Sequence, residues 1–387
     1  MKKEWEIKRL GEVCAIDKVH GIHRSLPYVG LENIESRSAR FIGSLEPQSV
    51  KSSTFRFSSE HILYGRLRPY LNKVIAPTFE GHCSTEIFPI KPSSLLTREY
   101  LLYWFLADST IDRINSTCTG TRMPRADMNE VMNFDFPLPP LSEQHRIVGI
   151  LDKAFESIAS AKANVEKNLQ SAHALFESQL QSVFTQRGEG WVENTLGELG
   201  AITSSKRIFK SEYVKSGIPF YRTKEVKELA NGREISTELF IPEARFKQIK
   251  EKFGVPEPGD ILLTAIGTIG EIYVVEGKND FYFKDGNVLW LKGFAKINPL
   301  FLKYVLISFV ESLNKMAHGA AYSALPIQRL NAHKIFVPSL AEQTEIVSQL
   351  DGLRETTMCL ESIYKRKIEA LEELKSSLLN QTVCGYL

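Results

Sequence analysis

The chain has 387 residues, of which 43% are hydrophobic and 24% charged, so it is a folding sequence long enough for two domains. No run approaches about 18 apolar residues, which excludes a membrane-spanning helix, and the start lacks the apolar segment of a secretion signal. The five cysteines form no Cys-x-x-Cys pair, so we expect free thiols and a cytoplasmic location. Because the net charge is only +2, any nucleic-acid binding has to come from local patches.

The most informative feature of the sequence is an internal repeat. Trp-x4-Leu-Gly-Glu begins at Trp5 and again at Trp191, and Pro-x-Leu-x-Glu-Gln begins at Pro139 and again at Pro338. The second copy is longer, and its extra residues fall between about 203 and 259. The repeat is compatible with an ordinary duplication that has one shared role. Divergent middles between similar ends favour one scaffold that recognises two different things.

Each copy has the same plan, a mixed globular stretch followed by a long helix, so we predict an α/β (α+β) fold with a pseudo-two-fold internal repeat. The four segments are 1–140, 141–187, 188–339 and 340–387. Short apolar runs bounded by turn residues predict strands. These runs are Pro27–Leu31, Ile261–Thr264, Glu271–Val275 and Asn287–Leu291, and the short helices expected beside them are Arg98–Leu106 and Pro299–Phe309.

The two long helical stretches, 141–185 and 340–384, contain apolar residues at steps of three and four and no proline. This is the a/d pattern of a coiled coil. Ser339 and Glu342 form a capping-box sequence at the start of the second helix, and Ser142 is a candidate cap for the first. The seam is compatible with simple bundle packing, but because the globular parts can form their own cores we favour a helix pair that separates two domains.

These motifs, their order and the alternating plan resemble the specificity (S) subunit of type I restriction–modification enzymes over essentially the whole chain. The strongest signature is Pro-x-Leu-x-Glu-Gln-x2-Ile-Val, which occurs twice. Pro258-Gly259-Asp260-Ile261-Leu262 is a further match in the second half, whereas the first half has Glu60-His61-Ile62-Leu63 at that turn and departs from the pattern. The end of the chain, 383–387, also has no close counterpart in the first copy.

The resemblance implies a non-catalytic subunit in which two target recognition domains each read one half of a split site in double-stranded DNA. It implies that the long helices form an antiparallel pair that sets the distance between the domains and docks two methyltransferase (modification) subunits. Motor–nuclease (restriction) subunits join that assembly. S-adenosylmethionine, ATP and Mg²⁺ are then expected in the partner subunits, with no cofactor in this chain and no membrane partner.

The residues themselves give little sign of catalysis. The sequence contains no Gly-x4-Gly-Lys-Ser/Thr phosphate loop and no amino-methyltransferase motif. Asp260 and Glu271 loosely suggest a nuclease acid pair, but no lysine follows, and a β-turn is the better interpretation. His20 and His23 lack the partner pair of a metal site, so we expect a loop there and no metal ligand.

Basic clusters in the globular parts are the candidate DNA contacts. Residues 1–140 hold 18 basic and 16 acidic side chains, and residues 188–339 hold 20 and 17. Lys and Arg beside small hydroxyl residues suit phosphates, and Arg can also read guanine edges. Taken singly, each of these residues is as compatible with a solvated surface charge. The candidates are Arg66, Arg68, Thr121, Arg122 and Arg125 in the first half, and Ser205, Lys206, Arg207, Arg222, Lys224 and Tyr322 in the second.

The long helices carry more apolar residues than a two-stranded seam needs, so we predict that a methyltransferase helix docks on them. The candidates are Val148, Phe155, Leu175, Phe184 and Val347; burial against the chain's own domains is the open alternative. A different class of function also stays open, a coiled-coil structural protein whose globular ends bind other proteins. DNA binding with salt-sensitive affinity would separate the two classes.

Overall fold

The computed structural model describes residues 5–120, 122–186, 188–277, 279–316 and 325–385. The chain forms two compact units, one built from residues 1–167 and 363–387 and the other from residues 168–362. Each unit therefore contains one globular domain and a part of both long helices.

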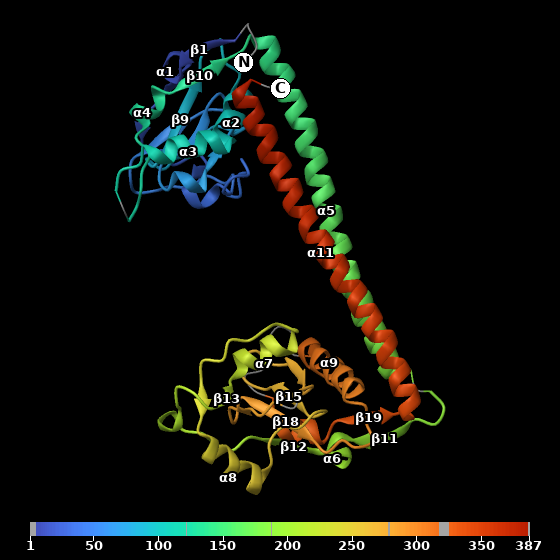
Figure 1. The fold of residues 1–387 in the computed structure, drawn as a ribbon. Helices are drawn as coiled ribbons and strands as arrows, with labels where there is room; N and C mark the ends of the chain where they lie inside the picture. Colours follow the sequence, from blue (N-terminus) through green and yellow to red (C-terminus); the bar gives the residue numbers. More distant parts are fainter. Residues whose placement is uncertain (1–4, 121, 187, 278, 317–324, 386–387) are drawn as a thin grey trace. The chain divides into compact units, whose positions relative to one another are not determined.

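The first domain is built on two four-stranded sheets and a two-stranded ribbon (Figure 1). The antiparallel sheet has the order β2 (Cys14–Ile16), β9 (Ile87–Pro92), β6 (Ile62–Gly65), β7 (Val74–Ile75). The second sheet has the order β3 (His20–Gly21), β5 (Thr54–Phe57), β8 (Gly81–Cys83), β4 (Tyr28–Val29), and β4 runs parallel to β8. The ribbon pairs β1 (Glu6–Arg9) with β10 (Asp135–Leu138).

Short helices complete the first domain. They are α1 (Leu10–Val13), η1 (Leu31–Asn33), η2 (Pro69–Leu71), α2 (Arg98–Leu106), α3 (Asp108–Ser116) and α4 (Met128–Met132). Helix α2 has the bounds that the sequence predicts. The strand expected over Pro27–Leu31 is shorter, because the backbone turns into η1 at Gly30, whose N–H donates to the Asn33 side chain at 2.8 Å.

The second domain repeats the four-stranded antiparallel sheet and the ribbon of the first. Its antiparallel sheet has the order β12 (Ala201–Ser204), β18 (Val288–Lys292), β15 (Ile261–Thr264), β16 (Ile272–Val274). The smaller sheet has the order β14 (Phe240–Ile241), β13 (Ile218–Tyr221), β17 (Tyr282–Phe283), with β13 parallel to β17. The ribbon pairs β11 (Val192–Thr195) with β19 (Lys334–Val337). The internal repeat thus holds for the four-stranded antiparallel sheet and the ribbon, whereas the smaller sheet has one strand fewer and β13, not β17, at its centre.

The helices of the second domain show where its additional residues lie. They are α6 (Leu196–Leu199), η3 (Lys210–Glu212), α7 (Thr223–Ala230), α8 (Glu243–Phe253), α9 (Pro299–Met316) and α10 (Ile327–Asn331). Helices α7 and α8 fall inside 203–259, where the sequence places the extra residues. The matching stretch of the first domain, all of it described, carries only η1 and short strands.

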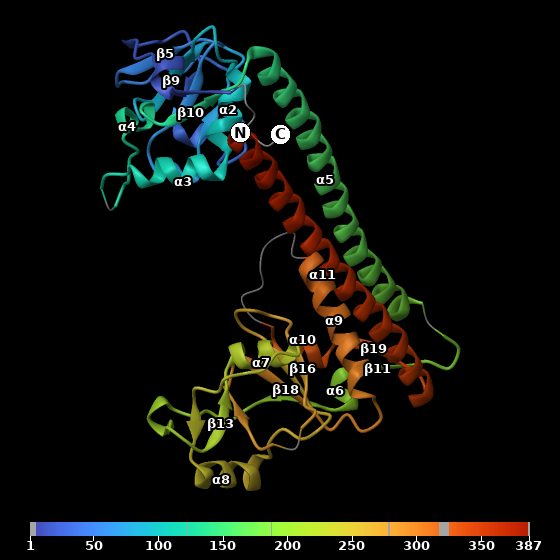
Figure 2. The same cartoon turned by 45° about the horizontal axis from the view of Figure 1, so that its top comes forward.

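The long helices are α5 (Leu141–Thr185) and α11 (Leu340–Cys384), as the apolar pattern predicts. They lie side by side in both views (Figures 1 and 2). The beginning of α5 shares a unit with the end of α11, so the two helices run antiparallel. In the first unit Lys162 pairs with Glu372 at 2.5 Å, and in the second His173 lies 4.0 Å from Glu361.

A buried glutamine joins each domain to the helix that follows it. In the first unit the Gln144 side chain accepts from the Thr97 N–H at 2.7 Å and donates to the carbonyls of Leu95 and Pro139 at 2.9 and 2.8 Å. These contacts satisfy backbone groups at the start of α2 and α5. Because the partners are one N–H group and two carbonyl groups, an amide side chain, which offers both an acceptor and two donors, fits all three.

Gln343 makes the equivalent contacts in the second unit. It accepts from the Asn298 N–H at 2.7 Å and donates to the carbonyls of Pro338 and Lys296 at 2.9 and 3.4 Å. Both glutamines are fully buried. The Pro-x-Leu-x-Glu-Gln motif is therefore a structural joint that each half of the chain uses once.

The other repeated motif, Leu-Gly-Glu, has an equally local cause. The carboxylate of Glu12 accepts from the Arg9 N–H at 3.0 Å, and that of Glu198 accepts from the Thr195 N–H at 2.6 Å, so each caps a short helix. A Cβ on the intervening glycine, Gly11 or Gly197, would lie 3.2 Å from a carbonyl oxygen of the facing helix. The glycine permits that close approach.

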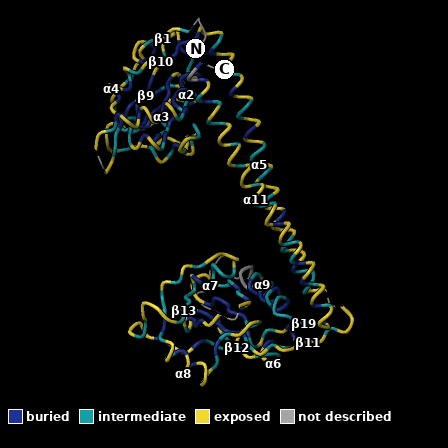
Figure 3. Tube along the Cα trace, in the orientation of Figure 1, coloured by how far each residue is buried: buried dark blue, intermediate teal, exposed yellow. Residues whose placement is uncertain are grey.

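Each globular domain has a separate hydrophobic core, drawn dark blue in Figure 3. Large aromatic side chains dominate the centre of the first, where Trp104 contacts Phe105 and Phe136 edge to face. In the second, Phe301 of α9 is fully buried against Phe184 of α5. Surface loops are thereby free to diverge on two packed scaffolds.

Candidate nucleic-acid interface

The structure brings the two basic clusters of the first half together. The Ala126 N–H donates to the Arg66 carbonyl at 2.9 Å, and the Arg68 N–H donates to the Pro124 carbonyl at 2.7 Å. Residues 66–68, which follow β6, therefore lie along the loop that ends at Arg125. We call the surface formed by Arg66, Arg68, Arg122 and Arg125 the first basic surface.

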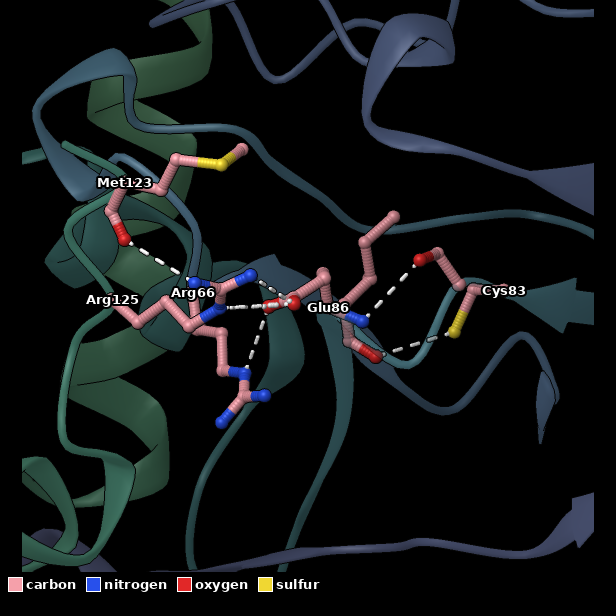
Figure 4. A network of polar contacts seen from close by, with 7 residues as sticks. Arg66, Cys83, Glu86, Met123 and Arg125 are labelled. Atoms are coloured by element: carbon pink, nitrogen blue, oxygen red, sulfur yellow. Dashed lines mark hydrogen bonds and ion pairs between the residues drawn. The ribbon is translucent and has the colours of Figure 1, made fainter. Parts of the chain in front are cut away.

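Two of these arginines share one carboxylate, which the sequence analysis did not single out. Glu86 accepts from the Nε of Arg66 at 3.0 Å and from the Nε of Arg125 at 3.0 and 3.2 Å (Figure 4). Burial alone would raise the pKa of Glu86, but the hydrogen bonds and charges of Arg125 and Arg66 lower it. Glu86 is thus ionised at neutral pH and holds both guanidinium groups in place.

An aromatic ring adds to this arrangement. The guanidinium carbon of Arg66 lies 5.1 Å from the ring centroid of Phe88, and the Lys18 ammonium lies 4.4 Å from the same centroid. Cation–π contacts of this kind orient a cation without neutralising it. Lys18 and Phe88 are therefore two further members of the site that sequence reasoning missed, since Lys18 follows β2 and Phe88 lies within β9.

Two of the remaining first-half candidates, Arg68 and Arg122, are at the surface. Arg68 has a left-handed backbone conformation with φ 52°, uncommon for a residue other than glycine, and is exposed, as is Arg122. Such strain is often found at functional positions. Thr121 lies outside the described residues.

In the second half the predicted cluster at 205–207 has mixed roles. Ser205 is only 8% exposed, and its hydroxyl donates to the Phe283 carbonyl at 2.7 Å, which is a fold contact. Lys206 is exposed, with its ammonium 4.5 Å from the Phe253 ring centroid. Arg207 is exposed too, and its Nε donates to Asp285 at 2.8 Å.

The other second-half cluster starts helix α7. Arg222 donates to Glu225 at 2.7 Å and to Glu238 at 2.9 Å, and these hydrogen bonds, the one to Glu225 first, raise its pKa. Lys224 is exposed and lies 3.7 Å from Glu238. Arg222 therefore orders the start of α7, whereas Lys224 is held less closely by its acidic neighbour. Tyr322 lies outside the described residues.

The two second-half clusters border the same segment, 282–286. The Tyr282 hydroxyl accepts from the Lys206 N–H at 2.7 Å, and the Lys284 N–H donates to the Tyr221 carbonyl at 2.9 Å. Lys284, also exposed, adds a positive charge between the clusters. Basic side chains from three segments thus gather on this part of the second domain.

Four of the five docking candidates pack on the chain's own domains. Phe155 contacts Tyr103 edge to face, and Lys375 of α11 lies 5.4 Å from its ring centroid. Val148 packs on the first core, while Phe184 and Val347 pack on the second. Leu175 differs, because it is 60% exposed.

Leu175 lines a shallow groove between α5 and α11 within the second unit. Gln179, Val183, Gln349, Leu350 and Leu353 line the rest of it. This groove is the part of the helix pair that best fits the predicted docking of a further helix.

The weak catalytic signals have structural explanations. Asp260 accepts from the Trp290 indole N–H at 2.8 Å and from the Glu257 N–H at 3.0 Å, as a turn residue does. Glu271 pairs with Lys227 at 3.2 Å. Within the described ranges, no group of three or more His, Cys, Asp or Glu side chains is placed to hold a metal ion.

Hydropathy along the described helices gives a negative result for membrane insertion: none is both long enough and apolar enough to cross a bilayer. The thiols Cys14, Cys83, Cys118 and Cys359 are free. Burial raises the pKa of Cys14 to about 12, so this thiol is protonated and unreactive at neutral pH.

Comparison with solved structures bears on the fold. A chain from a structure that addresses complex assembly and conformational transition of the type I R-M system aligns over 100% of this chain and 99% of its own length, with TM-score 0.83 and 22% identity. The HsdS subunit from Thermoanaerobacter tengcongensis aligns over 100% and 98%, with TM-score 0.67 and 22% identity. Both share the architecture of two globular domains and paired long helices.

Sequence comparison identifies the family. The EcoDI specificity subunit of Escherichia coli is 30% identical over 159 residues, 41% of this chain and 35% of that protein. Matches to the curated relatives span at most about two thirds of those proteins' length. The model of the type I restriction modification DNA specificity domain matches residues 2–170 and again residues 188–372. The chain belongs to the family of type I restriction–modification DNA specificity proteins, with one copy of the family's domain in each half.

Proposed function

We propose that the chain is the non-catalytic specificity subunit of a type I restriction–modification complex and reads a bipartite, asymmetric site in double-stranded DNA. The globular parts within 1–140 and 188–339 act as target recognition domains, each reading one half of the site. The helices α5 and α11 act as the spacer and as a scaffold for two methyltransferase subunits, which motor–nuclease subunits join. S-adenosylmethionine, ATP and Mg²⁺ belong to those partners.

The observation that carries this proposal is a duplicated scaffold with different surface chemistry in each copy. The strand order of the four-stranded antiparallel sheet, the buried glutamine joint and the capping glutamate repeat in both halves. The basic surfaces do not repeat, since the first uses arginines around Glu86 and the second uses charges around segment 282–286. A protein that reads two different half-sites needs this combination.

The test is an exchange of one domain. Residues 17–135 are replaced by the matching part of another specificity subunit, the chimera is co-expressed with the methyltransferase subunit, and methylated sites are mapped. One half of the site should change while the other half stays the same. The matched control replaces 203–333, which should change the opposite half; a simultaneous change of both halves by either exchange would contradict the two-reader proposal.

Direct binding separates this function from a purely structural role. The full-length chain, alone and with its methyltransferase partner, is titrated with duplex DNA at several salt concentrations. Affinity should fall steeply with salt because phosphate contacts release counterions. Absence of DNA binding in both preparations would favour an assembly protein whose domains bind other proteins.

A further inference from the structure

The position of Arg66 in the first domain is fixed by its backbone. Arg66 follows β6 directly, its N–H donates to the Glu86 carbonyl at 2.9 Å, and its carbonyl accepts from the Ala126 N–H at 2.9 Å. These two bonds join three chain segments. They involve main-chain atoms only, so they form with any side chain except proline at this position.

The second domain builds the same backbone arrangement with a different residue. Ala265 follows β15 directly, its N–H donates to the Asn287 carbonyl at 2.8 Å, and its carbonyl accepts from the Leu325 N–H at 2.9 Å. Strands β6 and β15 hold the same place in their sheets. Ala265 is therefore the structural equivalent of Arg66, and Asn287 that of Glu86.

The comparison shows that the fold does not need the arginine–glutamate cluster. The second domain forms its sheet and loop with Ala265 and Asn287, neither of which is charged. The position that matches Arg125 in sequence is Ala324, which lies outside the described residues. A charged cluster that one copy carries and its twin lacks is a candidate for function.

The geometry of the cluster separates the roles of its two arginines. Arg125 uses Nε and Nη2 on Glu86, and its Nη1 donates to the Met123 carbonyl at 3.3 Å. Arg66 uses only Nε on Glu86, and among the described residues its two terminal nitrogens have no hydrogen-bond partner. Figure 4 shows these terminal nitrogens pointing away from the carboxylate.

We propose that Arg66 is the side chain through which the first domain reads a guanine, and that Glu86 and Arg125 are residues that position it. This inference rests on the proposed function of that domain. The two free terminal nitrogens can donate together to O6 and N7 of a guanine in the major groove. Glu86 and the Phe88 ring fix the plane of the guanidinium before DNA arrives, which lowers the entropy lost on binding.

A phosphate contact would make less use of this construction. Both a lysine and an arginine bind phosphate, but a guanidinium whose plane is fixed can also donate two parallel hydrogen bonds to the acceptor pair of one base. Replacement of Arg66 should therefore reduce discrimination between base pairs. A phosphate contact would instead predict an equal loss of affinity for all DNA sequences.

The experiment compares Arg66→Ala and Arg66→Lys with the wild type in the full-length chain co-expressed with its methyltransferase. Each complex selects sites from a library of random duplexes, and the half-site of the first domain is assigned by the domain exchange described above. The matched control is Arg56→Ala, which removes an arginine of the same domain that pairs with Glu80 at 3.3 Å. Thermal unfolding of each variant checks folding.

The wild type should require a G·C pair at one position of the first half-site. Both Arg66 variants should lose preference there by roughly 5- to 150-fold, with the other positions unchanged. Arg56→Ala should keep the wild-type preference. Glu86→Gln should weaken the same preference without changing which base is preferred, since a neutral amide holds Arg66 less firmly.

Three results would overturn the assignment. The first is a wild-type half-site without any required G·C pair, and the second is full discrimination by Arg66→Lys. The third is an equal loss of affinity for all sequences in Arg66→Ala, which identifies a phosphate contact. In each case a two-part wild-type site would leave the proposed function standing, whereas unselective binding by the wild type would refute that function itself.

Discussion

The hydroxyl of Tyr304 donates to Asp351 Oδ1 at 2.5 Å, and the hydroxyl of Tyr103 donates to Asp152 in the same way. The first pair joins α9 to α11, and the second joins α2 to α5. Each tyrosine therefore ties the apolar helix of a domain to the long helix that follows. Burial, and then the bonded aspartate, raises the pKa of both phenols, so both remain donors at neutral pH.

The environments of the two pairs predict unequal contributions to stability. Tyr304 is 1% exposed, whereas Tyr103 is half-buried beside an exposed Asp152. Tyr304→Phe should lower the free energy of unfolding by about 1.5 to 3 kcal/mol, the usual value for a bond to a charged group. Tyr103→Phe should lower the free energy of unfolding by less, about 1 kcal/mol. Denaturant unfolding of both variants, with Asp351→Ala and the double variant as a cycle, measures the difference; equal costs would contradict it.

The cluster around Glu86 predicts a dependence of stability on pH. The folded protein lowers the pKa of this carboxyl below its ordinary value of 4.5. The ion pairs thus add stability that is complete above that value and is lost as the pH falls through the folded pKa. Wild type should be more stable than Glu86→Gln at neutral pH, and the gap should close in acid. Urea unfolding from neutral to acidic pH measures the difference in stability between the two proteins. The control is Glu80→Gln, which removes an exposed ion pair and should differ little in stability from the wild type.

The groove beside Leu175 predicts where a partner docks. Leu175→Glu should abolish methyltransferase pull-down while leaving thermal unfolding unchanged, because the side chain is largely exposed. Leu374→Glu, at another exposed leucine on α11, is the matched control and should bind normally. Phe155→Glu should instead destabilise the first unit, because Phe155 packs on Tyr103. Normal pull-down by Leu175→Glu would exclude this groove as the docking face.

The helix pair predicts the spacer of the DNA site. Lys162 of α5 lies beside Glu372 of α11, and His173 lies beside Glu361, so one heptad inserted after Lys167 and one after Arg366 fall at matched levels of the pair. Seven residues add about 10 Å, close to three base pairs, and keep the a/d seam in register. Three base pairs also turn the duplex by roughly 100°. Mapped sites should keep both half-sequences, with a spacer longer by about three base pairs and at lower efficiency. Full methylation at the original spacing would show that the helices are not the ruler.

The sequence predicts the long helices well for a simple reason. Their seams are periodic over the whole length, and prolines 139, 140 and 338 mark where they begin. The candidate site is harder, because its geometry depends on contacts between distant segments. Glu86 lies 20 residues from Arg66 and 39 from Arg125, and a lone glutamate before a strand gives no signal of either contact.

The orientation of hydroxyl side chains is equally hard to predict from the sequence. Ser205 stands in a polar run beside two cations, yet its side chain is turned into the fold and donates to the Phe283 carbonyl. The partner of Ser205 lies 78 residues further along the chain, so local sequence does not encode the contact. The sequence can thus locate a basic cluster, but it cannot tell which side chains of the cluster face solvent.

The buried Gln144 and Gln343 have a consequence for how such proteins change over generations. Each amide bonds only to carbonyl and N–H groups of its domain, so these hydrogen bonds do not depend on which side chains the domain displays on its surface. A foreign domain that presents the same main-chain groups will fit on the same helix. Under the proposed function, recombination at these two glutamines can therefore supply a new half-specificity in one genetic event, provided that the incoming domain also keeps the tyrosine that bonds to the long helix.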